Sequence, residues 1–205
     1  SFQGFNLQGK TIGIIGTGRI GLNVAQIARG FDMQILGFEP HPKEEIAKQY
    51  NIKYVDLDEL LANSDVITVH VPYLPATHHL INKDNIKKIK KGALFINTAR
   101  GEVMDTEALL MALKDGTVGG AGLDVLEGER QLKEEAALLA HYDPKHPSLD
   151  ELKTLLEDHV LINMPNVIIT PHIAFYTKEA KHEILKITVD NITGFTSGKP
   201  INQVS

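Results

Sequence analysis

The sequence predicts an α/β fold in which a doubly wound parallel sheet carries helices on both of its faces. Apolar, β-branched runs alternate with helical patterns along most of the 205 residues. Such alternation is typical of βαβ units, and their right-handed crossovers wind the chain to both sides of a buried parallel sheet. A glycine-rich turn directly after the first apolar run indicates a Rossmann-like version of this fold.

The expected strands and helices alternate in the order that the fold requires. Strands are predicted at 11–15, 33–38, 66–71, 93–97, 118–123 and 166–170. Helices are predicted at 19–30, 43–50, 57–62, 83–90, 105–114, 149–158 and 177–196. Residues 127–148 are irregular, and we expect a short helix and a surface excursion there. The last helix carries apolar residues near one stripe, so it is expected to dock on another surface.

Composition restricts the class of partner. The net charge of −5 argues against a general nucleic-acid surface. The lysine-rich segment 83–91 has no interleaved aromatic residues, and Ile86 and Ile89 stand at helical spacing. We therefore interpret it as the solvated face of a short helix. No apolar stretch is long enough to span a membrane.

The chain contains no cysteine, which excludes disulfides and thiolate metal sites. This composition fits a reducing compartment, and the cytoplasm is the expected location. The pairs His78-His79 and His141/His146 lack further ligands at a suitable spacing, so no metal site is predicted.

The segment Gly16-Thr17-Gly18-Arg19-Ile20-Gly21 lies between the first predicted strand and the first predicted helix. In that context Gly16 permits a tight turn, Gly18 lets backbone approach a pyrophosphate, and Gly21 lets helix and strand pack closely. The helix N-terminus then offers N–H groups and a positive dipole end to the phosphates. The alternative is a plain structural turn, but the strand–turn–helix context favours dinucleotide binding.

Glu39 ends the second predicted strand, 18 residues after Gly21. An acid at this point accepts hydrogen bonds from the adenosine ribose and repels a 2′-phosphate, so NAD is favoured over NADP. The neighbouring His41 would soften that preference. The alternative is a solvated Glu before a turn.

Val71 and Pro72 end the third predicted strand, and Pro75 and Thr77 follow shortly after. The prolines stiffen a loop at the carboxyl end of the sheet, where open α/β folds bind their ligands. The alternative is a rigid connector without a binding role.

Arg100 follows another predicted strand, in the segment Asn97-Thr98-Ala99-Arg100-Gly101. An Arg near apolar neighbours at a strand end needs an anion, and its guanidinium suits a carboxylate bidentately. The alternative is a surface Arg that pairs with a nearby Glu.

His172 ends the last predicted strand, and Asp124 ends the strand before it, with Glu127 and Glu129 close behind. A His with a carboxylate from a neighbouring strand end forms a general acid–base pair, because the carboxylate orients the ring and raises its pKa. The alternative is a structural His.

Five segments in this order resemble the D-isomer-specific 2-hydroxyacid dehydrogenase family, in its NAD-binding domain. They are the residues 9–21, 70–77, 97–101, 122–129 and 166–174. These segments are spread over most of the chain, from residue 9 to residue 174. The string Ala174-Phe-Tyr-Thr177 resembles the D-lactate dehydrogenase branch in particular.

The resemblance implies three catalytic roles. Arg100 would bind the substrate carboxylate and polarise the keto group. His172 would exchange a proton with the keto oxygen, and Glu129 would hydrogen-bond His172. Glu127 is the rival for that last role, but the family places the acid five residues after the strand-end Asp124, which selects Glu129.

The resemblance also implies an NAD site. Arg19 and Ile20 would meet the pyrophosphate through their backbone. Asp124, with Thr98 and Ala99, would hold the nicotinamide carboxamide. The residues expected around the cofactor are Gly16, Gly18, Arg19, Ile20, Gly21, Glu39, Val71, Pro72, Thr77, Thr98, Ala99, Arg100 and Asp124. The expected substrate is a small 2-hydroxy or 2-keto acid, with D-lactate and pyruvate as the candidate pair.

The chain departs from the family pattern in three places. Arg130 stands where the family usually has Pro, and the segment from Glu129 to His172 is longer than usual, which leaves the excursion at 130–160 unassigned. Members of the family begin with a substrate domain, whereas here almost nothing precedes the first strand. We therefore expect residues 1–205 to be the dinucleotide-binding domain, with helix 177–196 packing toward an absent substrate domain, and we expect weak turnover by this chain alone.

The resemblance leaves two classes of function open. The favoured one is an NAD-dependent oxidoreductase, which would form a homodimer because family members usually pair through this domain. The alternative is a non-catalytic, NAD-sensing interaction protein, similar to the corepressors of the family. A formate-type dehydrogenase is disfavoured, because oxidation of formate needs no carboxylate partner for His172.

Overall fold

The computed structural model describes residues 4–129 and 149–203. The chain divides into two compact units, Ser1–Pro171 and His172–Ser205, and each is treated by itself. In the described residues, no helix is both long enough and apolar enough to cross a lipid bilayer.

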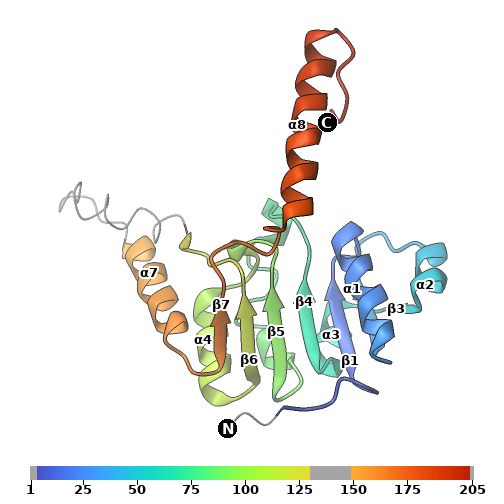
Figure 1. Ribbon diagram of the computed structural model, residues 1–205. Coiled ribbons are helices and arrows are strands. Elements are labelled where there is room, and N and C mark those ends of the chain that lie inside the picture. Colours follow the sequence, from blue (N-terminus) through green and yellow to red (C-terminus); the bar gives the residue numbers. More distant parts are fainter. Residues whose placement is uncertain (1–3, 130–148, 204–205) are drawn as a thin grey trace. The chain divides into compact units, whose positions relative to one another are not determined.

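The first unit is built on a parallel sheet (Figure 1). Its strands run in the spatial order β3-β2-β1-β4-β5-β6-β7, so the chain winds first to one side of β1 and then to the other. Within the described residues these strands are β1 (Thr11–Ile15), β2 (Gln34–Phe38), β3 (Ile52–Tyr54), β4 (Val66–Val69), β5 (Ala93–Asn97), β6 (Val118–Leu123) and β7 (Val167–Ile169). The prediction of a doubly wound parallel sheet is confirmed.

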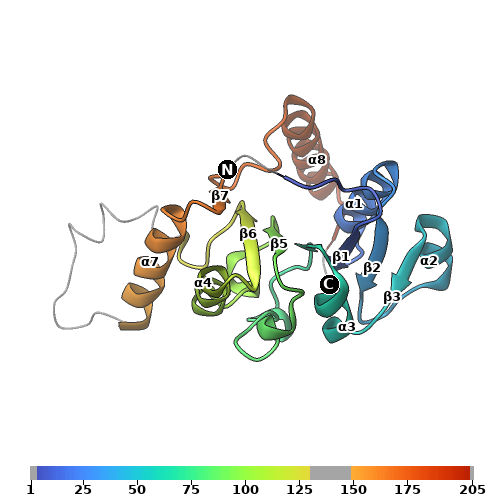
Figure 2. The ribbon, with the colours of Figure 1, turned by 90° about the horizontal axis from the view of Figure 1, so that it is seen from below.

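Helices cover both faces of this sheet. Helix α1 lies on one face, and α3 and α4 lie on the other (Figure 2). Asp56 and Asp105 begin α3 and α4, because each carboxylate accepts a backbone N–H of the first helical turn. The described helices of this unit are α1 (Arg19–Gly30), α2 (Glu44–Tyr50), α3 (Leu57–Asn63), α4 (Thr106–Asp115) and α7 (Leu149–Ile162).

The apolar residues of β1 explain why both faces are covered. Ile14 and Ile15 are neighbours in one strand, so they point to opposite faces of the sheet, yet both are fully buried. Ile14 packs in a cluster with Ala25 and Ala28 of α1. Ile15 belongs to the larger cluster under α3 and α4.

The sequence-based element bounds differ from the structure in a few places. The helix predicted at 83–90 is wrong, because the chain forms only a 3₁₀ turn there, Ile86–Lys88. Ile86 and Ile89 are buried while the lysines face outward, so the interpretation as a solvated face holds. Strand β3 was not predicted, and α7 continues four residues beyond the expected end. Most of the segment 127–148, including Arg130, lies outside the described residues.

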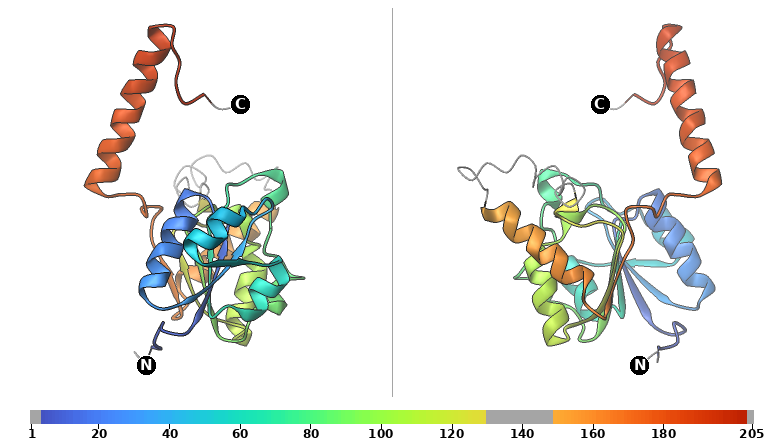
Figure 3. Two further views of the ribbon diagram at one scale, coloured as in Figure 1. Left: turned by 90° about the vertical axis from the view of Figure 1, so that its right-hand side faces the viewer. Right: turned by 60° about the vertical axis from the view of Figure 1, so that its left-hand side comes forward.

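The second unit is dominated by one helix, α8 (Lys178–Thr196), which Thr177 caps at its N-terminus. After α8 the chain turns back along the helix (Figure 3). Lys199 donates its backbone N–H to Gly194, and Asn202 bonds the side chain of Asn191. The predictions of a single domain over 1–205, and of a docking role for this helix, stay predictions.

Candidate functional site

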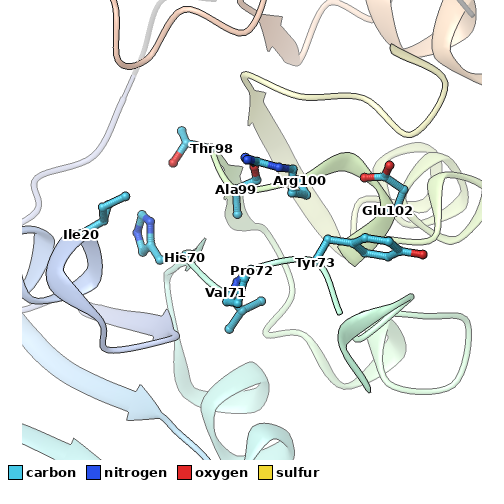
Figure 4. Close-up of a pocket in the computed structure, with 9 residues that line it drawn as sticks. All are labelled: Ile20, His70, Val71, Pro72, Tyr73, Thr98, Ala99, Arg100 and Glu102. Carbon is cyan, nitrogen blue, oxygen red and sulfur yellow. The ribbon is translucent and has the colours of Figure 1, made fainter. Parts of the chain in front are cut away.

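A pocket of about 570 Å³ opens where β1, β4 and β5 end (Figure 4). The chain reverses its winding direction between β1 and β4, and open α/β sheets bind ligands at such a point. Six of the lining residues were predicted from the sequence, namely Ile20, Val71, Pro72, Thr98, Ala99 and Arg100. Sequence reasoning missed the other three, His70, Tyr73 and Glu102.

The glycine turn has the geometry that a dinucleotide needs. Gly16 has φ +92°, and a Cβ there would lie 2.8 Å from Val71 Cγ1 at the end of β4. A Cβ on Gly21 would lie 2.1 Å from the Gly16 carbonyl oxygen, so α1 and β1 approach as closely as backbone allows. Around Gly18, in contrast, nothing in the described structure would meet a Cβ within 4 Å. The backbone is therefore open to a pyrophosphate at Gly18 and closed at the two other glycines.

Helix α1 offers its N-terminus to the same place. Gly18 is its N-cap, and within the described residues no side chain caps the first turn. An uncapped N-terminus leaves N–H groups and a positive dipole end for an anion. The residues present thus fit the diphosphate of NAD.

Glu39 lies on the glycine turn rather than in bulk solvent. Its Oε2 atom accepts the backbone N–H of Thr17 at 3.1 Å and the Thr17 hydroxyl at 3.3 Å. The Tyr54 hydroxyl lies 2.9 Å from that same Thr17 oxygen. The carboxylate is therefore held at the end of β2, beside the turn that would carry the pyrophosphate, as the ribose-binding hypothesis requires.

The loop after β5 presents Arg100 to the pocket. The buried amide of Asn97 fixes this loop, since it donates to the Arg100 carbonyl and accepts the Ala99 N–H, each at 2.9 Å. The Arg100 guanidinium bonds the Ala99 carbonyl at 2.6 Å and lies beside that residue in Figure 4. Among the described residues, no carboxylate forms an ion pair with it.

The loop after β4 contributes Val71, Pro72 and Tyr73 to the pocket, but not Thr77. The Thr77 hydroxyl instead bonds the Pro72 carbonyl at 2.7 Å and accepts the Leu74 N–H at 2.8 Å. Thr77 thus fixes the loop that carries the lining residues, and its direct contact with a cofactor stays a prediction.

His70 lines the pocket but was not predicted, because it directly follows the apolar residues of β4. Its Nε2 atom lies 2.9 Å from the Thr68 hydroxyl. Burial lowers the pKa of His70 to about 4, because water cannot solvate the imidazolium. The ring is therefore neutral near pH 7, and it adds no positive charge to the pocket.

The turn Leu126–Glu129, here called the acidic turn, follows β6. Glu127 is engaged through both carboxylate oxygens, because Oε1 lies 2.6 Å from His79 Nε2 and Oε2 accepts the Thr106 hydroxyl at 2.8 Å. The N–H of Glu129 donates to the Leu126 carbonyl. His79 and Thr106 were not predicted as partners of Glu127, because neither stands beside an acid in the matching segments.

Asp158 of α7 is fully buried beneath the acidic turn. Its Oδ2 atom accepts the Gly128 N–H at 2.8 Å, while its Oδ1 atom has no hydrogen-bond partner in the described structure. Burial raises the pKa of Asp158 to about 7 against the opposing effect of the Gly128 bond, and the nearby carboxylates of Glu127 and Glu157 raise it further.

Asp124 and His172 are the remaining predicted residues. Asp124 is buried at the end of β6, where it accepts the Thr170 hydroxyl and donates its backbone N–H to the Asn97 carbonyl. His172 opens the second unit with φ +55°, a conformation that non-glycine residues adopt rarely and often at functional sites. Within 4–129 and 149–203, no cluster of three or more His, Asp or Glu side chains is arranged to hold a metal ion.

The fold and the pocket define a dinucleotide-binding α/β domain. Residues 1–174 match the family model described as D-isomer specific 2-hydroxyacid dehydrogenase, NAD binding domain. The chain belongs to this family.

Known relatives agree with this assignment. The chain is 40% identical to D-lactate dehydrogenase kk1H of Curvularia clavata over 96% of this chain and 53% of that protein. It is 38% identical to a glyoxylate reductase of Pyrococcus horikoshii over 97% of this chain and 52% of that protein. A solved structure of the D-lactate dehydrogenase from Aquifex aeolicus, complexed with NAD and lactic acid, superposes with a TM-score of 0.79 at 39% identity, covering 96% and 58% of the two chains. The chain thus spans about half the length of the curated relatives it matches.

The raised pKa of Asp158 predicts a specific pH dependence of stability. Between the pKa of an unfolded Asp and about 7, the folded chain holds a proton that the unfolded chain loses, so stability falls as the pH rises. Asp158→Asn keeps an acceptor for Gly128 and removes this titration. We expect the free energy of unfolding of the variant, relative to the parent, to increase by up to about 4 kcal/mol from pH 4 to pH 8. Urea unfolding at both pH values measures it, and a pH-independent difference contradicts it.

Proposed function

We propose that this chain is the NAD-binding half of an oxidoreductase that transfers a hydride between NAD(H) and a D-2-hydroxy acid or its 2-keto acid, with D-lactate and pyruvate as the first pair to test. The observation that carries the proposal is the Arg100 guanidinium in the wall of a pocket at the end of the glycine turn, without a carboxylate partner in the described residues.

When bound, NAD(H) would supply or accept the hydride, and the residues of this chain would hold and orient it. The backbone at Gly18 and the N-terminus of α1 would hold the pyrophosphate, and Glu39 would accept hydrogen bonds from the adenosine ribose. Because the Glu39 carboxylate is already fixed by Thr17, it would repel a 2′-phosphate without rearranging, which favours NAD over NADP.

Arg100 would bind the carboxylate of the substrate. A guanidinium forms two parallel hydrogen bonds to a carboxylate, and this fixes the adjacent keto carbon toward the nicotinamide. Figure 4 shows Arg100 between Ile20 at one end of the pocket and the pair Tyr73 and Glu102 at the other. This position suits a group that binds substrate beside the cofactor.

His172 and Glu129 would form the acid–base pair. His172 would give a proton to the keto oxygen during reduction, and the Glu129 carboxylate would keep the imidazole protonated near neutral pH. The engagement of both Glu127 oxygens by His79 and Thr106 supports Glu129, rather than Glu127, as the partner.

The relatives named above carry the names of enzymes, which supports the oxidoreductase over an NAD-sensing protein. We also propose a homodimer that forms through α1. Ile27 lies in that helix and Phe31 is the residue directly after it, and both are large and apolar yet 61% and 52% exposed. A cytoplasmic location stays a prediction.

The first test is cofactor binding. The chain is expected to bind NADH, and Glu39→Ala is expected to weaken NADH about tenfold because a charge-assisted hydrogen bond to the ribose is lost. NADPH binding should change less. Fluorescence titration measures both cofactors, with Glu45→Ala of α2 as an exposed control. A chain that does not bind millimolar NADH contradicts the proposal.

The second test is turnover by the protein expressed from its complete gene. We expect Arg100→Gln to lower kcat/KM for pyruvate reduction by about 10² to 10³, because the substrate carboxylate loses its charged partner. The Kd for NADH should change much less than kcat/KM, since the guanidinium is assigned to the substrate carboxylate. Arg29→Gln, at an exposed guanidinium bonded to Gln49, is the matched control. An active Arg100→Gln enzyme argues against the assigned role.

The third test concerns assembly. Phe31→Glu places a charge on the proposed interface, so the variant is expected to be monomeric by light scattering at a concentration where the parent is dimeric. Met111→Glu changes an equally exposed apolar residue on α4 and should remain dimeric. A dimeric Phe31→Glu variant, or a monomeric parent, refutes the α1 interface.

A further inference from the structure

The acidic turn is fixed on three sides, and the proposed reaction uses only one of its residues. The first side is Gly101, directly after Arg100. A Cβ on Gly101 would lie 2.1 Å from the Leu126 carbonyl carbon and 2.4 Å from the Glu127 nitrogen. The loop that carries Arg100 and the turn that carries Glu129 are therefore in backbone-to-backbone contact.

The second side is the Glu127 side chain. His79 bonds one of its oxygens, and Thr106, the first residue of α4, bonds the other through both its hydroxyl and its backbone N–H. These contacts tie the middle of the acidic turn to α4 and to the loop after β4.

The third side is Asp158. Its carboxylate accepts the N–H of Gly128, the residue directly before Glu129. A Cβ on Gly128 would lie 2.6 Å from Asp158 Oδ2, so a larger residue at position 128 would require the carboxyl group or the turn to shift. The bond joins α7 to the turn across 30 residues of sequence.

We propose that Asp158 is a positioning residue that sets the direction of the Glu129 side chain by holding the Gly128 N–H. This inference rests on the proposed function, in which Glu129 is the carboxylate partner of His172. Without the bond, the backbone before Glu129 would rotate, and the carboxylate would leave the position that keeps the imidazole protonated.

The burial of Asp158 favours this role over simple packing. A fully buried carboxyl group loses its hydration and is unfavourable unless partners replace the water. Here Oδ1 has no partner in the described residues, and the bond of Oδ2 is made to the acidic turn. Leu161, three residues further along α7, shows that an apolar side chain fits the same buried side of the helix. The role of the Asp158 carboxyl group is therefore to hold the acidic turn rather than to fill the core.

The test compares Asp158→Ala with Asp158→Asn in the protein expressed from its complete gene. Alanine removes the acceptor, and asparagine keeps one. We expect Asp158→Ala to lower kcat for pyruvate reduction about tenfold or more and to move the alkaline limb of the kcat/KM profile down by about one pH unit. Asp158→Asn should retain the profile of the parent. The Kd for NADH should be unchanged in both.

Two further variants separate the possible outcomes. Leu161→Ala removes a buried side chain from the same helix without touching Gly128, so it should lower thermal stability and leave the pH profile unchanged. Glu129→Gln should shift the profile at least as far as Asp158→Ala. If Glu129→Gln has no effect, the proposed acid–base pair is wrong. If it shifts the profile and Asp158→Ala does not, the positioning role of Asp158 is wrong.

An equal effect of Asp158→Ala and Leu161→Ala on the pH profile also overturns the inference, since the loss would then follow stability alone. Should Asp158→Ala fail to fold, Gly128→Ala provides the second variant. Its Cβ would crowd Asp158 Oδ2 and so separate the carboxyl group from the backbone N–H of residue 128. It is expected to reproduce the shift of the alkaline limb, and an unshifted profile in a folded Gly128→Ala protein contradicts the proposal.

Discussion

The close approach of β1 and β4 at their carboxyl ends is the constraint on which the rest of the site depends. Gly16 can stand there because it tolerates φ +92° and because no side chain separates it from Val71 and the His70 carbonyl carbon. The same turn aims α1 so that its N-terminus faces the pocket rather than the core. A larger residue at position 16 would part the two strands and remove both the pocket wall and the anion site.

A second close backbone contact joins the loop that carries Arg100 to the acidic turn. Gly101 brings the Arg100 loop against the backbone of the acidic turn, while Asn97 fixes the same loop from the end of β5. The proposed substrate-binding residue and the proposed carboxylate partner thus share one backbone support. A displacement of either loop would be transmitted to the other, because two backbones in van der Waals contact leave no side chain to absorb it.

Local patterns predicted most of the fold, because strands buried on both faces read as apolar runs and helices begin at acids such as Asp105. Strand β3 was not predicted, because its three residues are too few to show an alternating pattern. A helix was wrongly predicted at 83–90, because two buried isoleucines three residues apart occur equally well in a 3₁₀ turn. Pocket residues near the motifs were found from their place at strand ends. The partners of the acidic turn were not, since Asp158 and His79 lie 30 and 48 residues from the groups they bond. Only the packed chain brings such residues together.

The distribution of charge in the pocket supports anion recognition more strongly than the motif alone does. His70 is neutral near pH 7, because burial holds its pKa near 4. Glu127 is turned away into its bonds with His79 and Thr106, and Glu39 is held on the glycine turn. Among the described residues that line the pocket, Arg100 therefore carries the positive charge, and Glu102 at the far end carries a negative charge. In the proposed function, a small acid would therefore bind with its carboxylate on the guanidinium and its keto carbon toward the nicotinamide.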